Sequence, residues 1–415
     1  MNASLAGPAV TKQSWLDTWL AALPAASGEL ELVQQRGRQA LTQLPLPSSR
    51  QEDWRFTDLA LLSGLPLAQP ASPAAVALAD PAPQALRLRW HGDADPLVGV
   101  ALPEGLQRLS PDEIAQGLGH TLAATGCEHH WPVELNHAAA ERVLALRVTS
   151  RSQVSLELIS AAAEGLQALR LLLLLEEKAQ LDLSQLVEAR GAGLHSLVIE
   201  AHLARGARLQ HGLVALGRSE AALLAHVAIE QEPESQAQLS SVSAGWGLAR
   251  LEPRVVQVDG QAHTELRGLQ LVEAQQLADT HSHVAFHGPE GQLDQLHKAV
   301  AAGQGRSVFN GAVRVPRAAQ RTNAAQLSRN LLLSDRARID TKPELEIVAD
   351  DVKCAHGATV SSLQTDELFY LQSRGIAADQ AAGLLQRAFC EEVLRDLPVA
   401  ARSWCPLERL LEAQA

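Results

Sequence analysis

The spacing of apolar and polar residues changes twice along the chain. In the first part, apolar residues recur at helical spacing in two runs that end at Pro24 and Pro45. The first run contains Trp15, Leu16, Trp19, Leu20 and Leu23, and the second contains Leu30, Val33, Ala40, Leu41 and Leu44. Residues 63–84 are rich in Pro, Ala and Ser, which favours an extended loop over a helix. We therefore expect an N-terminal helical domain and linker over residues 1–84.

From about residue 85 to about residue 358 the period becomes two, as in strands with one buried face, and helical spacing is nearly absent. Small residues open several of these segments at intervals of roughly 25 to 30 residues, the size of one solenoid repeat. The small residues at these starts are Ala179, Ala207, Ala237 and Ala262. The clearest alternating segments are VSLELIS (154–160), AQLDLSQLV (179–187), ARLQHGLVAL (207–216), AQLSSVSAG (237–245), TELRGLQLV (264–272) and ARIDTKPELEIV (337–348).

Two architectures fit such short strands. A β-sandwich would show more evenly spaced turns and more aromatic core residues than the 3% of Phe, Trp and Tyr found here. A coiled parallel sheet needs only stacked Leu, Val and Ile inside each turn. The pattern therefore favours a mainly β protein with a parallel β-helix core over residues 85–358.

Helical spacing returns from about residue 359. Thr365 precedes two acidic residues suited to the first turn of a helix, and Gly375 stands where a helix C-terminus is expected. A second apolar stripe ends at Pro398, and a short helical tail is expected with Pro406 near its start. The stripe consists of Leu384, Leu385, Ala388, Phe389, Val393 and Leu397. We expect a C-terminal helical domain over residues 359–415.

Composition narrows the function classes. The net charge of −12 over 415 residues argues against binding to nucleic acid or to an anionic membrane surface. The N-terminus lacks the features of a signal peptide, and no apolar run reaches membrane-spanning length. Four scattered cysteines do not form a disulfide framework. These features predict a cytoplasmic protein with reduced thiols.

Common catalytic motifs are missing. The segment GQGRSVFNG lacks the lysine and the spacing of a phosphate-binding loop, and no GxSxG nucleophile motif is present. Asp350 and Asp351 are adjacent, so on a strand they would face opposite ways and form a weak acid–base pair.

Several histidines and cysteines are expected to be structural. The segment GCEHHWPVELNH lacks the second ligand pair of a usual zinc site, and the strand around His281 and His283 shows no carboxylate or cysteine partners nearby. Cys390 and Cys405 lie in apolar helical surroundings, where cysteine acts as a small hydrophobic residue. The candidate ligands in GCEHHWPVELNH are Cys127, His129, His130 and His137. His287 follows the strand that contains His281 and His283.

The segment ADDVKCAHGATV (349–360) differs from these. Cys354 and His356 are two residues apart, so in an extended segment both side chains project from one face. Thiolate and imidazole are ligands that suit iron in an iron–sulfur centre, but such a cluster generally takes four ligands. The pair is therefore either half of a site completed by a partner or part of a simple turn.

Three segments resemble the SufB/SufD family of iron–sulfur cluster assembly proteins. The longest runs from VFNGAVRVPRAAQRTNAAQLSRN through CAHGATV to LQTDELFYLQSRGI, over residues 308–376. QEDWRFTDL (51–59) and LADTHSHVAFHGPEGQLDQLHKAV (277–300) are similar to the family as well, so the resemblance covers nearly the whole chain. The CAHGAT form is similar to the SufD branch, with Ala355 where a serine is common.

The resemblance implies a right-handed parallel β-helix between helical domains. It implies a non-enzymatic scaffold that pairs with SufB through the β-helices and holds the ATPase SufC through its C-terminal helices. Sulfur would come from a cysteine desulfurase. His356, with Cys354 beside it, would contribute to a transient iron–sulfur cluster at the SufB interface, with no stable cluster on the isolated chain. Whether a homodimer forms without SufB stays open.

Two alternatives to this scaffold role remain. A β-helical carbohydrate-active enzyme would need a cleft with clustered acidic residues, which the pattern does not show. A SufB-like scaffold that assembles clusters by itself would need more thiols than Cys127 and Cys354, the two in or near the β region.

Overall fold

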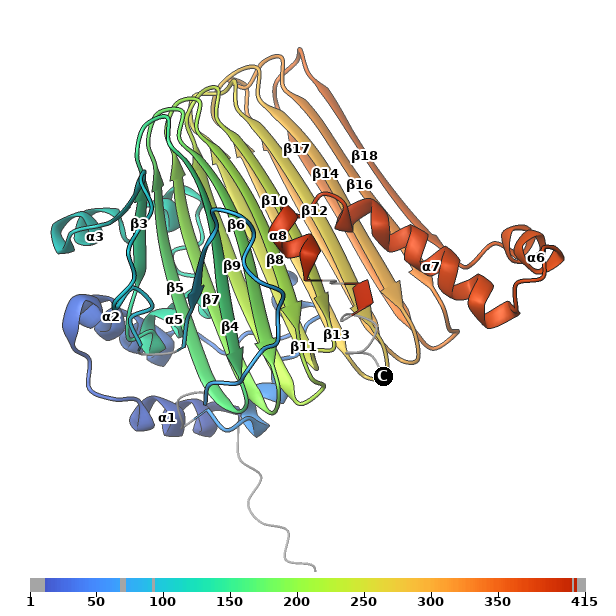
Figure 1. Cartoon of the computed structure of the whole chain (residues 1–415), viewed down its shortest axis with the longest axis horizontal. Coiled ribbons are helices and arrows are strands. Elements are labelled where there is room, and N and C mark those ends of the chain that lie inside the picture. The colour runs from blue at the N-terminus through green and yellow to red at the C-terminus, as the bar shows by residue number, and fades with distance from the viewer. Residues whose placement is uncertain (1–11, 68–71, 92–93, 405–406, 409–415) are drawn as a thin grey trace, which may run out of the picture.

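The computed structural model describes residues 12–67, 72–91, 94–404 and 407–408. Its core consists of two nine-stranded sheets that face each other (Figure 1). Sheet B contains, in spatial order, β1 (Leu86–Arg89), β4 (Gln153–Ala162), β6 (Gln180–Ala189), β8 (Arg208–Leu216), β10 (Gln236–Ala244), β12 (His263–Val272), β14 (Gln292–Ala301), β16 (Asn323–Leu332) and β18 (Lys353–Ser361). Sheet A contains β2 (Leu106–Arg108), β3 (Leu144–Val148), β5 (Gly165–Leu175), β7 (Gly193–Leu203), β9 (Ala221–Gln231), β11 (Leu248–Gln257), β13 (Leu277–Phe286), β15 (Arg306–Val315) and β17 (Arg338–Ile347).

The chain alternates between the two sheets, so each coil adds one strand to each of them. From β3 and β4 onward, each strand pairs in parallel with the next strand of its own sheet. Equivalent positions therefore stack, as Leu181 does on Leu209 and Leu209 on Ala237. This arrangement is a parallel β-helix, which confirms the predicted fold class.

The tight turns from sheet A to sheet B explain the repeat seen in the sequence. Lys178, Gly206 and Glu234 each have positive φ, in turns that recur roughly every 28 residues. One residue later, Ala179 and Ala207 point into the core and are fully buried. Their small side chains fit because the turn closes the end of the coil.

Most of the interior between the sheets is an apolar cluster, mainly of Leu, Val, Ile and Ala. Parallel strands that are covered on both faces have long apolar runs in their sequence, because both sets of side chains are buried. All eleven residues of β9 are buried, whereas the sequence pattern predicted one buried face. Helices and loops that pack on the outside of both sheets account for the difference.

The N-terminal helices pack on the outer face of sheet A (Figure 1). The sequence predicted α1 and α2 but not α3–α5, which lie inside the range expected to be strands. Their bounds are α1 (Lys12–Ala22), α2 (Glu31–Gln43), α3 (Pro111–Gly117), α4 (His120–Ala124) and α5 (Trp131–Ala139), with 3-10 turns η1 (Gly28–Leu30), η2 (Glu52–Trp54) and η3 (Ala60–Gly64).

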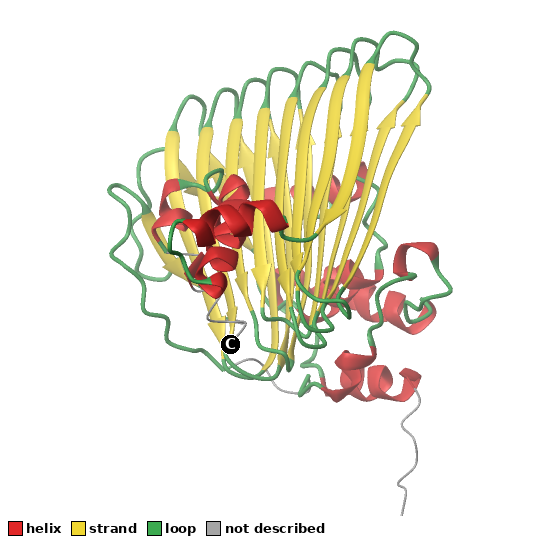
Figure 2. Cartoon of the chain, turned by 90° about the vertical axis from the view of Figure 1, so that its right-hand side faces the viewer, coloured by secondary structure: helices red, strands yellow, loops and turns green. Residues whose placement is uncertain are grey.

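The C-terminal helices α6 (Thr365–Ser373), α7 (Ala378–Leu394) and α8 (Val399–Ser403) lie on the side of sheet B (Figure 2). Cys390, Val393 and Leu394 of α7 pack on the outer face of sheet B. Gly375 has φ +86° just after α6, as the sequence predicted for a helix end. Pro406 lies outside the described residues.

From residue 72 to β1 the proline-rich segment contains no helix, as predicted, yet this part is not a detached linker. The backbone N–H of Ala74 donates a hydrogen bond to the carbonyl oxygen of Ala161 on β4. Val76 is buried in the same apolar cluster as α7. Within the described residues, no helix combines the length and apolarity required to cross a membrane.

The two ends of the β-helix differ. At the N-terminal end the edge strands β1 and β2 have only four and three residues. At the C-terminal end, β17 and β18 have ten and nine residues, and neither has a neighbour on its outer side in the described chain. We call this C-terminal pair of strands the open end.

Candidate functional site

Cys354 and His356 both lie on β18, at the open end. The two positions share one face of the strand, as the sequence predicted. Cys354 is half-buried and packs against the apolar cluster between the sheets, whereas His356 is exposed. Both positions therefore lie on the inward-facing side of the last coil.

A line of polar residues continues from His356 into the β-helix. His356 is the register partner of Gln326 on β16. The Gln326 side-chain amide donates to Gln295 Oε1 at 2.9 Å, and the Gln295 amide donates to Ser282 Oγ at 2.7 Å. Gln326, Gln295 and Ser282 are thus linked by hydrogen bonds inside the core, and His356 lies next to this polar row at its solvent end.

Cys354 differs from the other thiols that the structure describes. Burial raises the pKa of Cys127 to about 11 and that of Cys390 to about 12, so both remain protonated and inert. Partial burial also raises the pKa of Cys354, and a hydrogen bond with the backbone of Ala324 offsets part of this effect. Cys354 alone of these three combines partial exposure with a histidine on the same face. Cys405 lies outside the described residues.

A second exposed feature lies on the C-terminal helices. No residue of α6 is buried, and Phe369 and Tyr370 on it are exposed. Leu384 in the first half of α7 is exposed too, although the later part of that helix packs on sheet B. Apart from the contact of Arg374 with the Tyr370 ring, these large apolar side chains on two neighbouring helices are exposed to solvent in the part of the chain that the structure describes.

The histidines predicted to be structural separate into two groups. His137 is buried against Glu134, with 3.0 Å between Nδ1 and Oε2, and burial lowers its pKa to about 3. His281 and His283 share the outer face of sheet A, and burial lowers the pKa of His283 to about 4. The expectation that this strand lacks a carboxylate was wrong, because His281 Nε2 lies 3.1 Å from Asp279 Oδ1.

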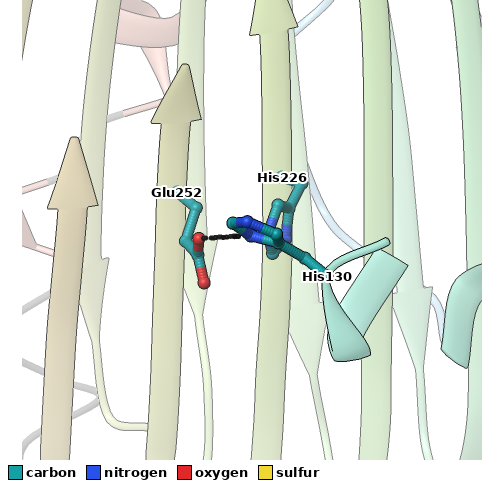
Figure 3. A group of neighbouring side chains, drawn as sticks. All are labelled: His130, His226 and Glu252. Atoms are coloured by element: carbon teal, nitrogen blue, oxygen red, sulfur yellow. Dashed lines mark ion pairs between the residues drawn. The ribbon is translucent and has the colours of Figure 1, made fainter. Parts of the chain in front are cut away.

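His130 belongs to a cluster that the sequence did not predict. It approaches His226 on β9 and Glu252 on β11, which are register partners in sheet A (Figure 3). Cationic Arg250, together with the neighbouring histidines, holds the pKa of Glu252 well below its usual range despite burial. Burial lowers the pKa of His226. Residues 130 and 252 are too far apart in the sequence for spacing to connect them.

The family of the chain follows from a match over residues 158–389 to the model described as SUF system FeS cluster assembly, SufBD core domain. The chain belongs to the SufB/SufD family. That range begins in β4 and extends into α7, so it includes most of the β-helix and the open end.

Similar proteins carry related names. An iron–sulfur cluster assembly SufBD family protein of Synechocystis is 39% identical over 242 residues, covering 56% of this chain and 53% of that protein. The iron–sulfur cluster assembly protein SufD of Escherichia coli is 33% identical over 197 residues, which cover 47% of this chain and 46% of that protein. The chloroplastic protein ABCI7 of Arabidopsis thaliana is 41% identical over 202 residues, which cover 48% of this chain and 42% of that protein. The chain thus spans about half the length of the curated relatives it matches. Each of these relatives is similar to this chain over part of its length, which agrees with the match to the family model.

Proposed function

We propose that this chain is a non-enzymatic scaffold subunit that assembles iron–sulfur clusters together with SufB and the ATPase SufC. The observation that carries the proposal is the placement of Cys354 and His356 on one face of β18, the last strand of the open end. Ligands at an unpaired edge are accessible to a second protein.

The number of ligands supports a shared site. An iron–sulfur cluster generally needs four protein ligands, and this edge offers one thiol and one imidazole. A SufB subunit docked on the open end would supply the others, so the cluster would be transient and held between the two chains. A self-sufficient scaffold has less support, because Cys127 and Cys390 are buried with raised pKa values.

The open end suits such a partner physically. Unpaired backbone groups along β17 and β18 can pair with strands of another chain, as in other cases of strand addition. Ile347, Val348 and Val360 are exposed there and would be buried by it. For SufC we propose a different surface, the exposed apolar residues of α6 and α7.

The test is complementation of a strain that lacks SufD, combined with pull-down of SufB and SufC. We expect His356→Ala to leave the complex intact and to abolish cluster assembly, with Cys354→Ala less severe because a thiol on SufB can replace the lost one. His287→Ala, at an exposed turn, is the matched control. Normal complementation by His356→Ala would refute the ligand role, and loss of the complex would make the residue structural.

A further inference from the structure

We propose that His130, His226 and Glu252 form a binding site for a divalent transition metal of the Fe²⁺ and Zn²⁺ class on the outer face of sheet A. The site shares no residue with the open end, so it does not depend on the role proposed for Cys354 and His356. Figure 3 shows the three side chains converging from a loop and two neighbouring strands.

The geometry of the ligand atoms fits one small ion. His226 Nε2 lies 3.2 Å from Glu252 Oε2, and His130 Nδ1 lies 3.4 Å from the same oxygen. One ligand atom from each residue lies within 4.8 Å of the other two. Ligands bound at about 2.1 Å around a tetrahedral ion lie roughly 3.4 Å apart, so little movement is needed.

The backbone fixes these positions. His226 and Glu252 face each other on β9 and β11, so sheet pairing sets their separation. His130 precedes α5, whose second residue is Pro132, and the two imidazole rings meet edge to face with centroids 5.7 Å apart. A site held by a sheet and a helix start is largely formed before an ion arrives.

His226 is also short of partners. The residue is buried, and neither of its ring nitrogens has a hydrogen bond among the residues that the structure describes. Its approach to Glu252 is close but not aligned as a hydrogen bond. Because buried polar atoms are nearly always paired, a metal ion at this point would supply the missing partner.

Two arginines determine how strongly the site attracts a cation. Arg250 Nε donates to Glu252 Oε1 at 2.7 Å, which leaves Oε2 for the ion, and its charge is balanced by Asp279 at 2.7 Å. Arg254 Nη2 lies 3.3 Å from Oε2, the oxygen that the ion would use. Arg254 therefore competes with the metal.

The site opens to a surface hollow. A cavity of about 410 Å³ is lined by His130 and Glu252, and by Glu52 and Asp53 of the N-terminal region. Glu52 is paired with Lys342 Nζ at 2.6 Å and Arg250 lines the same hollow, so the attraction of a cation rests on the three site residues themselves. The space leaves room for water or another ligand on the ion. Two imidazoles and one carboxylate with open positions are a ligand set of iron(II) and of catalytic zinc sites.

The experiment uses the full chain, stripped with chelator and kept anaerobic. Co²⁺ is titrated by optical absorption, and Fe²⁺ and Zn²⁺ are then tested by competition with Co²⁺. We expect one ion per chain, with affinity reduced at least about 10-fold in His130→Gln and in Glu252→Gln. The matched control is His202→Gln, because His202 lies beside Glu230 and Glu232 on the same sheet but outside the cluster. The metal affinity of His202→Gln should match that of the unmodified chain.

A gain of affinity is the sharper expectation. Arg254→Gln removes the competing charge and should tighten binding several-fold, which a merely structural His–Glu pair would not show. His130 lies at the edge of the hollow, so His130→Gln should fold normally by circular dichroism even if His226→Gln does not. Dissociation constants above about 100 µM for all three ions would overturn the proposal. Equal affinity in His130→Gln and His202→Gln would overturn it as well.

Discussion

Three histidines point into the interior of the β-helix rather than toward solvent. His195, His211 and His297 are buried, and burial lowers their pKa values to about 4, 4 and 3. His211 Nε2 lies 3.1 Å from Gln185 Oε1, and His297 stacks on Phe309 with ring centroids 4.3 Å apart. At neutral pH they act as neutral, space-filling groups.

Protonation of these residues should destabilise the fold. The unfolded chain binds a proton at each imidazole below about pH 6.5, whereas the folded chain does so only near pH 4 or lower, so stability is lost as pH falls through this window. We expect His211 alone to contribute about 2 kcal/mol of loss between pH 7 and pH 5. Denaturant midpoints at the two pH values measure it. His211→Gln should reduce the pH dependence, and exposed His287→Gln should not; an unchanged dependence in His211→Gln would contradict the assignment.

A second prediction at this scale concerns a buried ion pair. Glu200 accepts a hydrogen bond from Arg170 at 2.7 Å, and both side chains are buried. Glu200 also accepts from the backbone N–H of Gly119, which places the start of α4. Glu200→Ala leaves an uncompensated buried charge, which typically costs about 3–5 kcal/mol of unfolding free energy. Adding Arg170→Met should recover part of this.

The measurement is equilibrium unfolding in denaturant. The control is Glu232→Ala, a partly exposed carboxylate on the turn after β9, which should change stability by less than about 0.5 kcal/mol. If Glu200→Ala were no more harmful than this control, the buried pair would not be holding α4 on the sheet.

At the scale of elements, the long strands were predictable and the short helices were not. Alternating residues and small residues at the turns identified the repeat, because every coil obeys the same packing rule. Helices α3–α5 have five to nine residues, too few for a clear helical period. One signal was available: Ser110 and Glu113 form a capping box around Pro111, and S-x-x-E with proline marks a helix start.

The site residues were predictable to different degrees. Cys354 and His356 are two residues apart, so strand geometry alone places them on one face. His130, His226 and Glu252 come from a loop and two strands, and only the coiling of the chain brings them together. Sequence spacing carries no information about such a cluster until the register of the sheets is known.

The C-terminal helices give a prediction at the element scale. Truncation before α7 would expose the apolar cluster on sheet B, so point variants are cleaner than deletion. Phe369 is 70% exposed and Leu384 is 48% exposed, so replacing both with Ala should change stability by less than about 1 kcal/mol. We expect the double variant to lose SufC in pull-down while SufB pairing persists. Leu32→Ala on α2, also exposed, is the control, and retained SufC binding in the double variant would place the contact elsewhere.

On the scale of the whole molecule, the β-helix is asymmetric along its axis. Its first coil ends in strands of three and four residues, which offer few unpaired backbone groups. Its last coil ends in strands of ten and nine residues with apolar side chains in solvent. Monomeric proteins normally protect long unpaired strand edges, for example with charged residues, proline or a covering loop. This asymmetry supports the proposed pairing at the open end.

The last prediction tests that asymmetry. Val348 is 51% exposed and Val360 is 46% exposed at the open end, so a lysine at either position is well solvated in the isolated chain and should leave its thermal unfolding nearly unchanged. Docking of SufB would bury the added charge without a partner, so we expect pairing to weaken at least about 10-fold for each variant. Val98→Lys is the control, because Val98 is 78% exposed in the loop between β1 and β2. Analytical ultracentrifugation of mixtures with SufB gives the affinities. A lysine weakens pairing only where the bound partner buries it. Loss of pairing in Val98→Lys but not in the other two variants would therefore mean that SufB binds the opposite end of the β-helix.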